Sequence, residues 1–187
     1  MYDLSWIKSP EKIWSRKEIL DRRECPIPKE RGIYGWFFKE IPPIVPIENC
    51  VVKDNLVLLY VGISPTRRES KRTLYDRIVK CHFNGNASIS TLRLSLGCLL
   101  ADKLKIRLQK IGGKGRMSFG PGETTLSKWI SEKAFVCWQV NSQPWNWEKT
   151  IISQISLPLN LTHNQAHPFY KKLKEIRDTA RKEAKDK

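Results

Sequence analysis

The chain has 187 residues, a length that favours one domain with its own core over two. Its hydrophobic content of 40% and its 7 tryptophans exclude a disordered chain. Its 34 Lys and Arg outnumber 19 Asp and Glu, so the formal net charge is +15. An excess of this size favours a polyanionic partner, most commonly nucleic acid, although an anionic membrane surface or simple solubility would also account for it.

The start of the chain shows no targeting or membrane signal. The segment MYDLSWIKSPEK is charged and lacks the apolar stretch of a signal peptide. No apolar run approaches the about 20 residues that a membrane-spanning helix needs. We therefore expect a soluble, cytoplasmic protein. The motif SRKE predicts a helix start, because Ser15 and Glu18 have the spacing of a capping box.

Three apolar segments predict the strands of a small sheet. They are GIYGWFF at 32–38, LVLLYVGI at 56–63 and AFVCWQV at 134–140. The segment between the first two, 39–55, contains IPPIVP, whose prolines are incompatible with a central strand. We expect this segment to be a surface insertion.

Helices are predicted around 72–83, from Thr91 to about Leu104, over 143–156, and from Phe169 to the end. Together with the strands they indicate a small sheet flanked by helices. We expect three parts along the chain: a helical N-terminal extension, a main domain, and a charged C-terminal helix or tail. Their expected bounds are 1–30, 31–170 and 171–187.

Two other features are weak signals of chemistry. The segment GGKGRMSFGPGE at 112–123 lacks the GxxxxGK[ST] pattern, which excludes a Walker-type phosphate loop. A flexible DNA-facing loop and a plain connection both stay open there. The 5 cysteines include no CxxC pair, which argues against a zinc or redox motif. Cys81, Cys98 and Cys137 lie among apolar neighbours and are predicted to be small buried residues.

The first two predicted strands each carry a tyrosine and a glycine two residues apart. Residues two apart share one face of a strand, so Gly32 lies beside Tyr34 and Tyr60 beside Gly62. If these strands pair, two phenols share a face next to two positions without side chains. Such positions let a bulky ligand approach the backbone. The alternative is a pair of sheet tyrosines packed on a helix.

These motifs and three residues further along resemble the GIY-YIG nuclease superfamily. GIY stands at 32–34, and YVG at 60–62 differs from the second half of the family motif by one methyl group. The segment TLYDRIVKCHF supplies Arg77 for the family's helix arginine. The segment WNWEKTIISQISLPLN supplies Glu148 and Asn160 for its metal-binding glutamate and its asparagine. Five matches in order are far more specific than any one of them.

Taken singly, each downstream residue has a structural alternative. Glu148 could be an anion placed favourably near a helix N-terminus. Arg77 could form a surface ion pair with Glu69 or Asp76. Asn160 could serve a turn. The combination of all three with both tyrosine motifs favours a site.

The resemblance implies an α+β fold with a small three-stranded, mostly antiparallel sheet, and a metal-dependent DNA endonuclease that hydrolyses phosphodiester bonds. Glu148 would hold one Mg²⁺, or another divalent cation such as Mn²⁺. Arg77 would bind phosphate oxygens, and Tyr34 would orient the attacking water or accept its proton. Tyr60 would position the phosphate or support Tyr34. Asn160 would hold the geometry of the site.

The histidines depart from the family pattern. Related nucleases often carry a histidine one helical turn after the arginine, whereas His82 follows Arg77 by five residues. At 100° per residue it lies off the face of Arg77, so we expect an auxiliary catalytic role for His82. His163 and His167 match no metal site, and packing or solvent exposure is expected for both.

Basic residues on the loops and the helix around Arg77 are candidates to bind the nucleic acid. They are Arg67, Arg68, Lys71, Arg72, Lys80, Lys114 and Arg116. The expected partner is DNA, with no membrane, and a homodimer would serve cleavage of both strands. A nucleic-acid-binding module that keeps the fold without cutting is the alternative, and a structural or regulatory protein is a weaker one. Restriction, repair and mobile-element roles all stay open.

Overall fold

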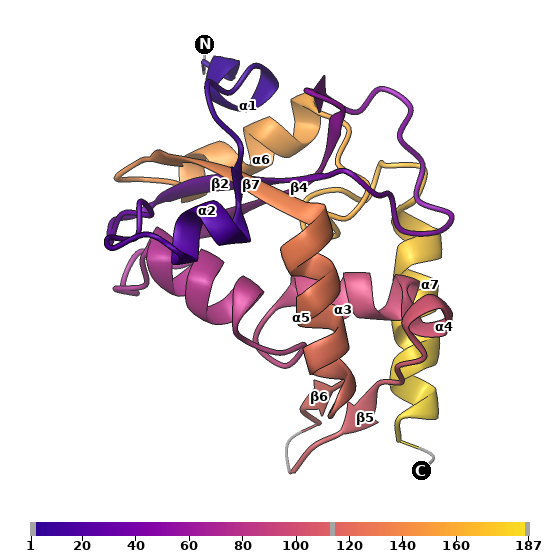
Figure 1. Cartoon of the computed structure of the whole chain (residues 1–187). Coiled ribbons are helices and arrows are strands. Elements are labelled where there is room, and N and C mark those ends of the chain that lie inside the picture. Colours follow the sequence, from indigo (N-terminus) through magenta and orange to yellow (C-terminus); the bar gives the residue numbers. More distant parts are fainter. Residues whose placement is uncertain (1–2, 113–114, 186–187) are drawn as a thin grey trace.

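The computed structural model describes residues 3–112 and 115–185 (Figure 1). Its centre is an antiparallel sheet of five strands in the spatial order β1-β7-β2-β4-β3. The central strands are β7 Ala134–Val140, β2 Gly32–Phe38 and β4 Leu56–Ser64. These three match the strands that the sequence predicts, so the α+β class and the antiparallel pairing are confirmed.

The predicted number of three strands is wrong, because two short edge strands complete the sheet. β1 Trp14–Ser15 pairs with β7, and β3 Val52–Lys53 pairs with β4. Two residues are too few to show strand periodicity, so neither edge is visible as a pattern. The β3–β4 connection does carry a signal: Asp54 and Asn55 both have positive φ, 51° and 60°, as a tight two-residue hairpin turn requires.

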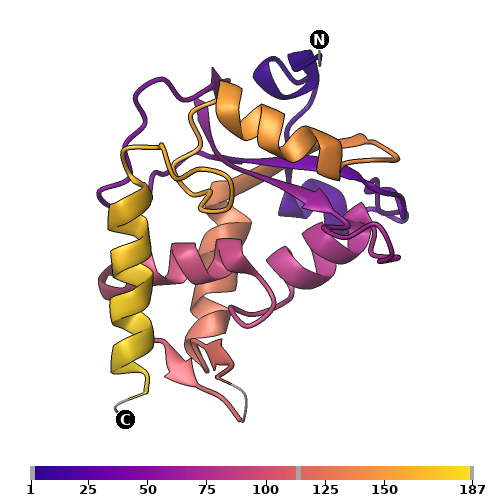
Figure 2. The ribbon, with the colours of Figure 1, turned by 180° about the vertical axis from the view of Figure 1, so that it is seen from behind.

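The two faces of the sheet pack against different helices. Ile33 and Phe37 of β2 point towards α1 Ser5–Lys8 and α6 Trp145–Gln154, in a cluster with Ile151. The intervening Tyr34, Trp36 and Phe38 belong to a second cluster on the opposite face. Figures 1 and 2 show α1 and α6 on one side of the sheet and the remaining helices mainly on the other. Burial on both faces explains why β2 is apolar almost throughout.

The other helices lie on the Tyr34 side of the sheet or beyond it. They are α2 Arg16–Leu20, η1 Asp76–Phe83, α3 Thr91–Leu99, α4 Ala101–Leu104, α5 Gly122–Lys133 and α7 Tyr170–Glu183. The capping box of α2 is confirmed, because the Ser15 hydroxyl accepts from Glu18 N–H and Glu18 accepts from Ser15 N–H. The helix predicted up to Leu104 forms two pieces that meet at Leu100. The sequence analysis missed α5.

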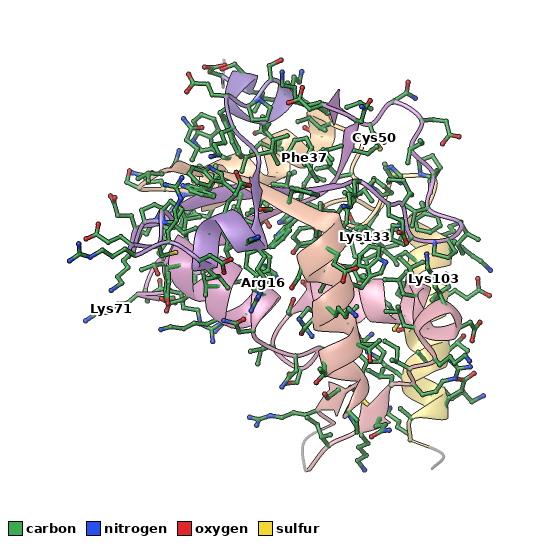
Figure 3. All side chains as sticks on the ribbon, in the orientation of Figure 1. Arg16, Phe37, Cys50, Lys71, Lys103 and Lys133 are labelled. Atoms are coloured by element: carbon green, nitrogen blue, oxygen red, sulfur yellow. The ribbon has the colours of Figure 1, made fainter. Side chains whose placement is uncertain are left out.

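Both terminal segments pack onto this body. Ile7 and Ile19 near the N-terminus have no exposed surface, and Leu173 of α7 is equally buried. Figure 3 shows the contrast between the interior, where Phe37 lies, and the periphery, where Lys71 extends into solvent. The predicted domain bounds of 1–30, 31–170 and 171–187 stay a prediction.

The described part of the glycine-rich segment contains β6 Met117–Ser118 and the start of α5, and β6 pairs with β5 Gln109–Lys110 in a second, two-stranded sheet. Cys81, Cys98 and Cys137 are buried and free, as predicted. In the part of the chain that the structure describes, no helix combines the length and hydropathy needed to cross a bilayer.

Candidate active site

Tyr34 lies at the centre of the site because of the register between β2 and β4. It stands opposite Gly62, and its ring crosses that strand where no side chain intervenes. A Cβ on Gly62 would lie 2.3 Å from the Tyr34 hydroxyl oxygen. A Cβ on Gly32 would likewise lie 2.7 Å from Leu74 Cδ1. The expectation that these glycines leave room for a ligand is wrong: the protein's own side chains occupy that room.

His82 makes the direct hydrogen bond to this phenol. The Tyr34 hydroxyl and His82 Nε2 are 2.9 Å apart, and His82 Nδ1 lies 2.8 Å from the hydroxyl oxygen of Ser90. The imidazole has no exposed surface. Burial, together with the positive charges of Arg77 and Arg93, lowers the pKa of His82 well below its usual value, so the ring is neutral at neutral pH.

The helix that carries Arg77 and His82 differs from the one assumed in the sequence analysis. η1 is a π-helix, in which N–H groups bond to carbonyls five residues back, as Asn84 N–H does to Val79 O at 3.0 Å. A π-helix turns through a smaller angle per residue than an α-helix, so residues five apart lie closer to one face. The expectation that His82 lies off the face of Arg77 is therefore wrong, because it used the angular step of an α-helix. Both side chains reach Tyr34.

Arg77 interacts electrostatically with both tyrosines. The phenols of Tyr34 and Tyr60 act to raise the pKa of its guanidinium. One amino group donates to Ile89 O at 2.9 Å, while the buried Nε has no hydrogen-bond partner among the described residues. The alternative of an ion pair with Asp76 fails, because that carboxylate pairs with Lys80 at 2.7 Å. Arg77 therefore keeps its Nε–H donor without a partner among the described residues.

Burial dominates the acidity of Tyr34. Its side chain is 1% exposed, and desolvation raises the pKa of the phenol far above its usual value. The Tyr60 phenol and the Glu148 carboxylate act in the same direction, and Arg77 acts against them. Arg77 thus has the expected effect on this pKa, but that effect is smaller than the effect of burial. The phenol keeps its proton in the metal-free protein.

Glu148 enters the site from the first turn of α6. Its carboxyl group is half-buried, and burial raises its pKa, while the charges of His163 and Arg77 lower it. No hydrogen bond or ion pair to this carboxylate occurs among the described residues. A half-buried carboxylate without a hydrogen-bond partner carries a desolvation cost that the charges of His163 and Arg77 offset only in part, and a cation would offset it further. The donor set therefore fits a hard divalent ion that keeps most of its waters. No cluster of three or more potential metal ligands occurs in the described ranges.

Asn160 links the site to β4. Its side-chain oxygen accepts from Val61 N–H at 2.9 Å, and its side-chain amide donates to Val61 O at 2.8 Å. Leu159 N–H also donates to Leu59 O at 3.0 Å. The segment before His163 thus pairs with β4 beyond the end of β3. This pairing fixes Tyr60 and Gly62, which flank Val61.

A sequence model of the GIY-YIG catalytic domain matches residues 32–179. This chain belongs to the GIY-YIG family. The resemblance drawn from the motifs is confirmed, and the matched range contains all six predicted catalytic residues. Comparisons with curated proteins and with solved structures found no match.

Tyr60 of this GIY-YIG domain lies at the edge of the site. Its hydroxyl is 3.4 Å from the Thr91 hydroxyl, and its ring meets the His82 ring edge-on at 6.3 Å. It is 9% exposed. Tyr60 is thus placed to support the Tyr34–His82 pair as well as to contact a substrate.

The basic residues predicted to bind nucleic acid fall into two places. Arg67, Arg68, Lys71 and Arg72 are exposed on the loop between β4 and η1. Lys71, Arg72 and Lys80 line one open hollow of about 500 Å³ beside Ile89, the residue that Arg77 contacts. The structure therefore places these residues next to the site.

Arg116 is exposed but lies beside β6, which Figures 1 and 2 show at the end of the GIY-YIG domain away from the sheet. Lys114 lies outside the described residues. His163 is exposed, one of the two alternatives that the sequence predicts for it, and its charge also acts on Glu148. Its position three residues after Asn160 was the available signal.

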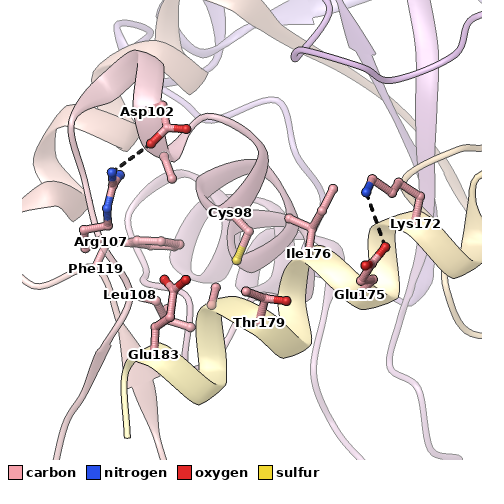
Figure 4. A pocket seen from close by; sticks show the side chains of 12 residues that line it. Cys98, Asp102, Arg107, Leu108, Phe119, Lys172, Glu175, Ile176, Thr179 and Glu183 are labelled. Carbon is pink, nitrogen blue, oxygen red and sulfur yellow. Dashed lines mark hydrogen bonds and ion pairs between the residues drawn. The ribbon is translucent and has the colours of Figure 1, made fainter. Parts of the chain in front are cut away.

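A separate hollow of about 550 Å³ opens between α4 and α7 (Figure 4). Four of its charged side chains form two ion pairs, Arg107 with Asp102 at 2.8 Å and Lys172 with Glu175 at 3.3 Å. None of the six predicted catalytic residues lines it. The candidate active site of the GIY-YIG domain therefore lies at the η1–β4–α6 junction.

Proposed function

We propose that this GIY-YIG protein is a divalent-metal-dependent DNA endonuclease. One observation carries the proposal: the Tyr34 phenol lies within reach of the charges of Arg77 from η1 and Glu148 from α6, and it is hydrogen-bonded to His82. Phosphodiester hydrolysis needs these functions together, namely a group that orients the attacking water, a cation for the phosphate and a carboxylate for a metal ion.

Arg77 is the phosphate-binding group of the proposal. Its guanidinium is held in place by the bond to Ile89 O and has a buried Nε–H without a partner among the described residues. A guanidinium presents donors in a fixed fork that matches two phosphate oxygens. In this position it would stabilise charge as it develops on the reacting phosphate.

Tyr34 and His82 form the proposed pair that orients the attacking water. In the tautomer with its proton on Nδ1, His82 donates to Ser90 and accepts the Tyr34 O–H proton at Nε2. The low pKa of His82 keeps Nε2 available as an acceptor. This bond would hold the Tyr34 hydroxyl in one orientation, so that its oxygen can accept a hydrogen bond from the attacking water and orient it.

Glu148 would hold the metal ion, and a bound divalent cation would supply charge neutralisation at the phosphate and a more acidic water. Its carboxylate is suited to this role because burial leaves it without a hydrogen-bond partner among the described residues. Arg77 would limit the repulsion between this carboxylate and the phosphate. Asn160 contributes by fixing β4 at Val61.

DNA is the proposed substrate because of the exposed arginines and lysines that surround the site, in a chain of formal charge +15. A binding module that does not cut is the alternative. It predicts salt-sensitive DNA binding whose affinity does not depend on Glu148 or on Mg²⁺.

The test is cleavage of supercoiled plasmid DNA with Mg²⁺ or Mn²⁺ by the wild type and by Glu148→Gln. We expect the substitution to lower the rate by roughly 100-fold or more while the protein stays folded. Glu132→Gln, at an exposed position on α5, is the matched control and should cut like the wild type. Wild-type protein that cuts no DNA with either ion, or Glu148→Gln that cuts equally fast, would contradict the proposal.

A further inference from the structure

Three distant segments bring two arginines onto one tryptophan. Arg31 precedes β2, Arg68 lies in the loop after β4, and Trp145 is the first residue of α6. The guanidinium carbons of Arg31 and Arg68 lie 5.6 and 5.5 Å from the centre of the Trp145 ring. Arg31 also donates from Nη2 to Arg68 O at 3.1 Å. The indole ring and this hydrogen bond hold the two cations side by side.

Neither cation has a counter-ion within the described residues. Ion pairs occur elsewhere on the surface, for example between Arg107 and Asp102, but neither Arg31 nor Arg68 forms one. Two neighbouring like charges repel, and a ring face compensates each of them only partly. The arrangement therefore produces a local positive potential that an anion would satisfy.

The cluster lies close to the candidate active site. Trp145 is three residues before Glu148, one turn earlier on α6. The loop that carries Arg68 leads directly into η1, where Arg77 lies. Backbone hydrogen bonds fix this corner of the fold, since Asn141 N–H donates to Arg31 O at 2.9 Å.

We propose that Arg31 and Arg68, held against Trp145, bind a backbone phosphate of the DNA next to the phosphate that is cleaved. This rests on the proposed function, and it adds Arg31 and Trp145 to the DNA-binding surface. Guanidinium groups bind phosphate oxygens in pairs, and phosphate contacts position a nucleic acid without reading its sequence. Because two guanidinium groups lie against the ring, the cluster offers charge and not an open face for base stacking.

The experiment measures binding of a fluorescein-labelled 20-base-pair DNA duplex by anisotropy between 50 and 300 mM salt, in EDTA so that nothing is cut. The slope of log K against log salt is negative. We expect Arg31→Ala and Arg68→Ala each to make it shallower by about 0.9, which is about a fivefold loss of affinity near 0.15 M. Trp145→Ala should weaken binding and Trp145→Phe should not. Arg107→Ala removes the same charge from a paired position and should leave the slope unchanged.

The outcomes separate the two proposals. If the wild type binds and cuts DNA while Arg31→Ala and Arg68→Ala bind with unchanged slope and affinity, the phosphate site is wrong and the proposed function stands. If the wild type neither binds nor cuts DNA, the proposed function fails and the phosphate site fails with it. Cleavage kinetics add a second readout, since these variants should raise KM and leave kcat near the wild-type value, whereas Arg77→Ala should lower kcat. A loss of folding is detected by thermal unfolding of each variant.

Discussion

The Asn160 side chain pairs with both backbone groups of Val61, at 2.9 and 2.8 Å, in the way a neighbouring strand would. β3 covers only the first residues of β4, so Asn160 satisfies the backbone where the sheet has no further strand. One amide side chain thus links the loop after α6 to the strand that carries Tyr60 and Gly62.

We expect Asn160→Ala to lower the free energy of unfolding by about 2–4 kcal/mol, because two buried backbone groups lose their partners. Cleavage should fall as well, since Tyr60 and Gly62 lose their fixed position. Chemical denaturation and the plasmid assay measure the two effects. Asn146→Ala, at an exposed position on α6, is the control and should change stability by less than about 0.5 kcal/mol. Equal effects of the two substitutions would contradict this role of Asn160.

Gly62→Ala should disable the site through Tyr34. The added methyl group would lie 2.3 Å from the phenol oxygen, so the ring must leave its position beside His82. Overpacking of this kind costs about 1–3 kcal/mol. In a Tyr34→Ala background the same substitution should cost much less, because the clashing ring is gone. A double-mutant cycle of unfolding free energies measures the difference, and a strictly additive result would exclude the contact as the cause.

Glu148→Gln should make the metal-free protein more stable at neutral pH. Burial raises the pKa of Glu148 above 4.5, so the folded state holds this proton more tightly than the unfolded state does. The free energy of unfolding of the wild type therefore falls as the pH rises through the raised pKa. Glutamine does not ionise, so the variant does not lose this stability. We expect Tm to rise by roughly 2–4 °C, the equivalent of about 1 kcal/mol in a chain of this size.

Thermal unfolding in EDTA across pH 4 to 8 measures this effect. Added Mn²⁺ should stabilise the wild type and not the glutamine variant, because a ligand that binds only the folded state raises Tm. Glu132→Gln should match the wild type under both conditions. A metal-free Glu148→Gln protein that is less stable than the wild type at pH 7 would contradict the interpretation that burial destabilises the ionised carboxylate.

His82 should make the fold sensitive to mild acid. Its pKa is lowered by burial and by Arg77 and Arg93. Below about pH 6.5, His82 is therefore protonated in the unfolded chain and stays neutral in the folded state. Stability then falls as the pH drops below that value. His82→Gln should flatten this dependence, and it should retain more cleavage than His82→Leu because glutamine can still accept from Tyr34. The pH dependence of stability in His82→Gln is compared with that in His167→Gln, because burial also lowers the pKa of His167.

Local patterns were sufficient for the parts of the fold that repeat over several residues. The three central strands follow from apolar runs, and the spacing of Ser15 and Glu18 predicted the start of α2. The order of Tyr34, Arg77 and Glu148 identified the family, which the family match confirms. These features are encoded in short windows, where side-chain type and spacing act directly on the backbone.

Other features depend on contacts between distant segments. The π-helix brings His82 onto the face of Arg77, although its sequence was interpreted with α-helical spacing. The two edge strands are too short to show a period of two. His163 lies in the segment after Asn160, and apart from this position no local pattern indicates that its charge acts on Glu148.

The sequence by itself determined the central strands, the family and the types of group available for chemistry, because strand periodicity and motif order need no knowledge of the rest of the chain. Only the tertiary structure decided which of these groups meet. Tyr34 reaches His82 because Gly62 has no side chain, and Arg31 meets Arg68 because both pack on Trp145. Such side-chain contacts depend on the register of the strands and the packing of the helices, which are set by the whole core.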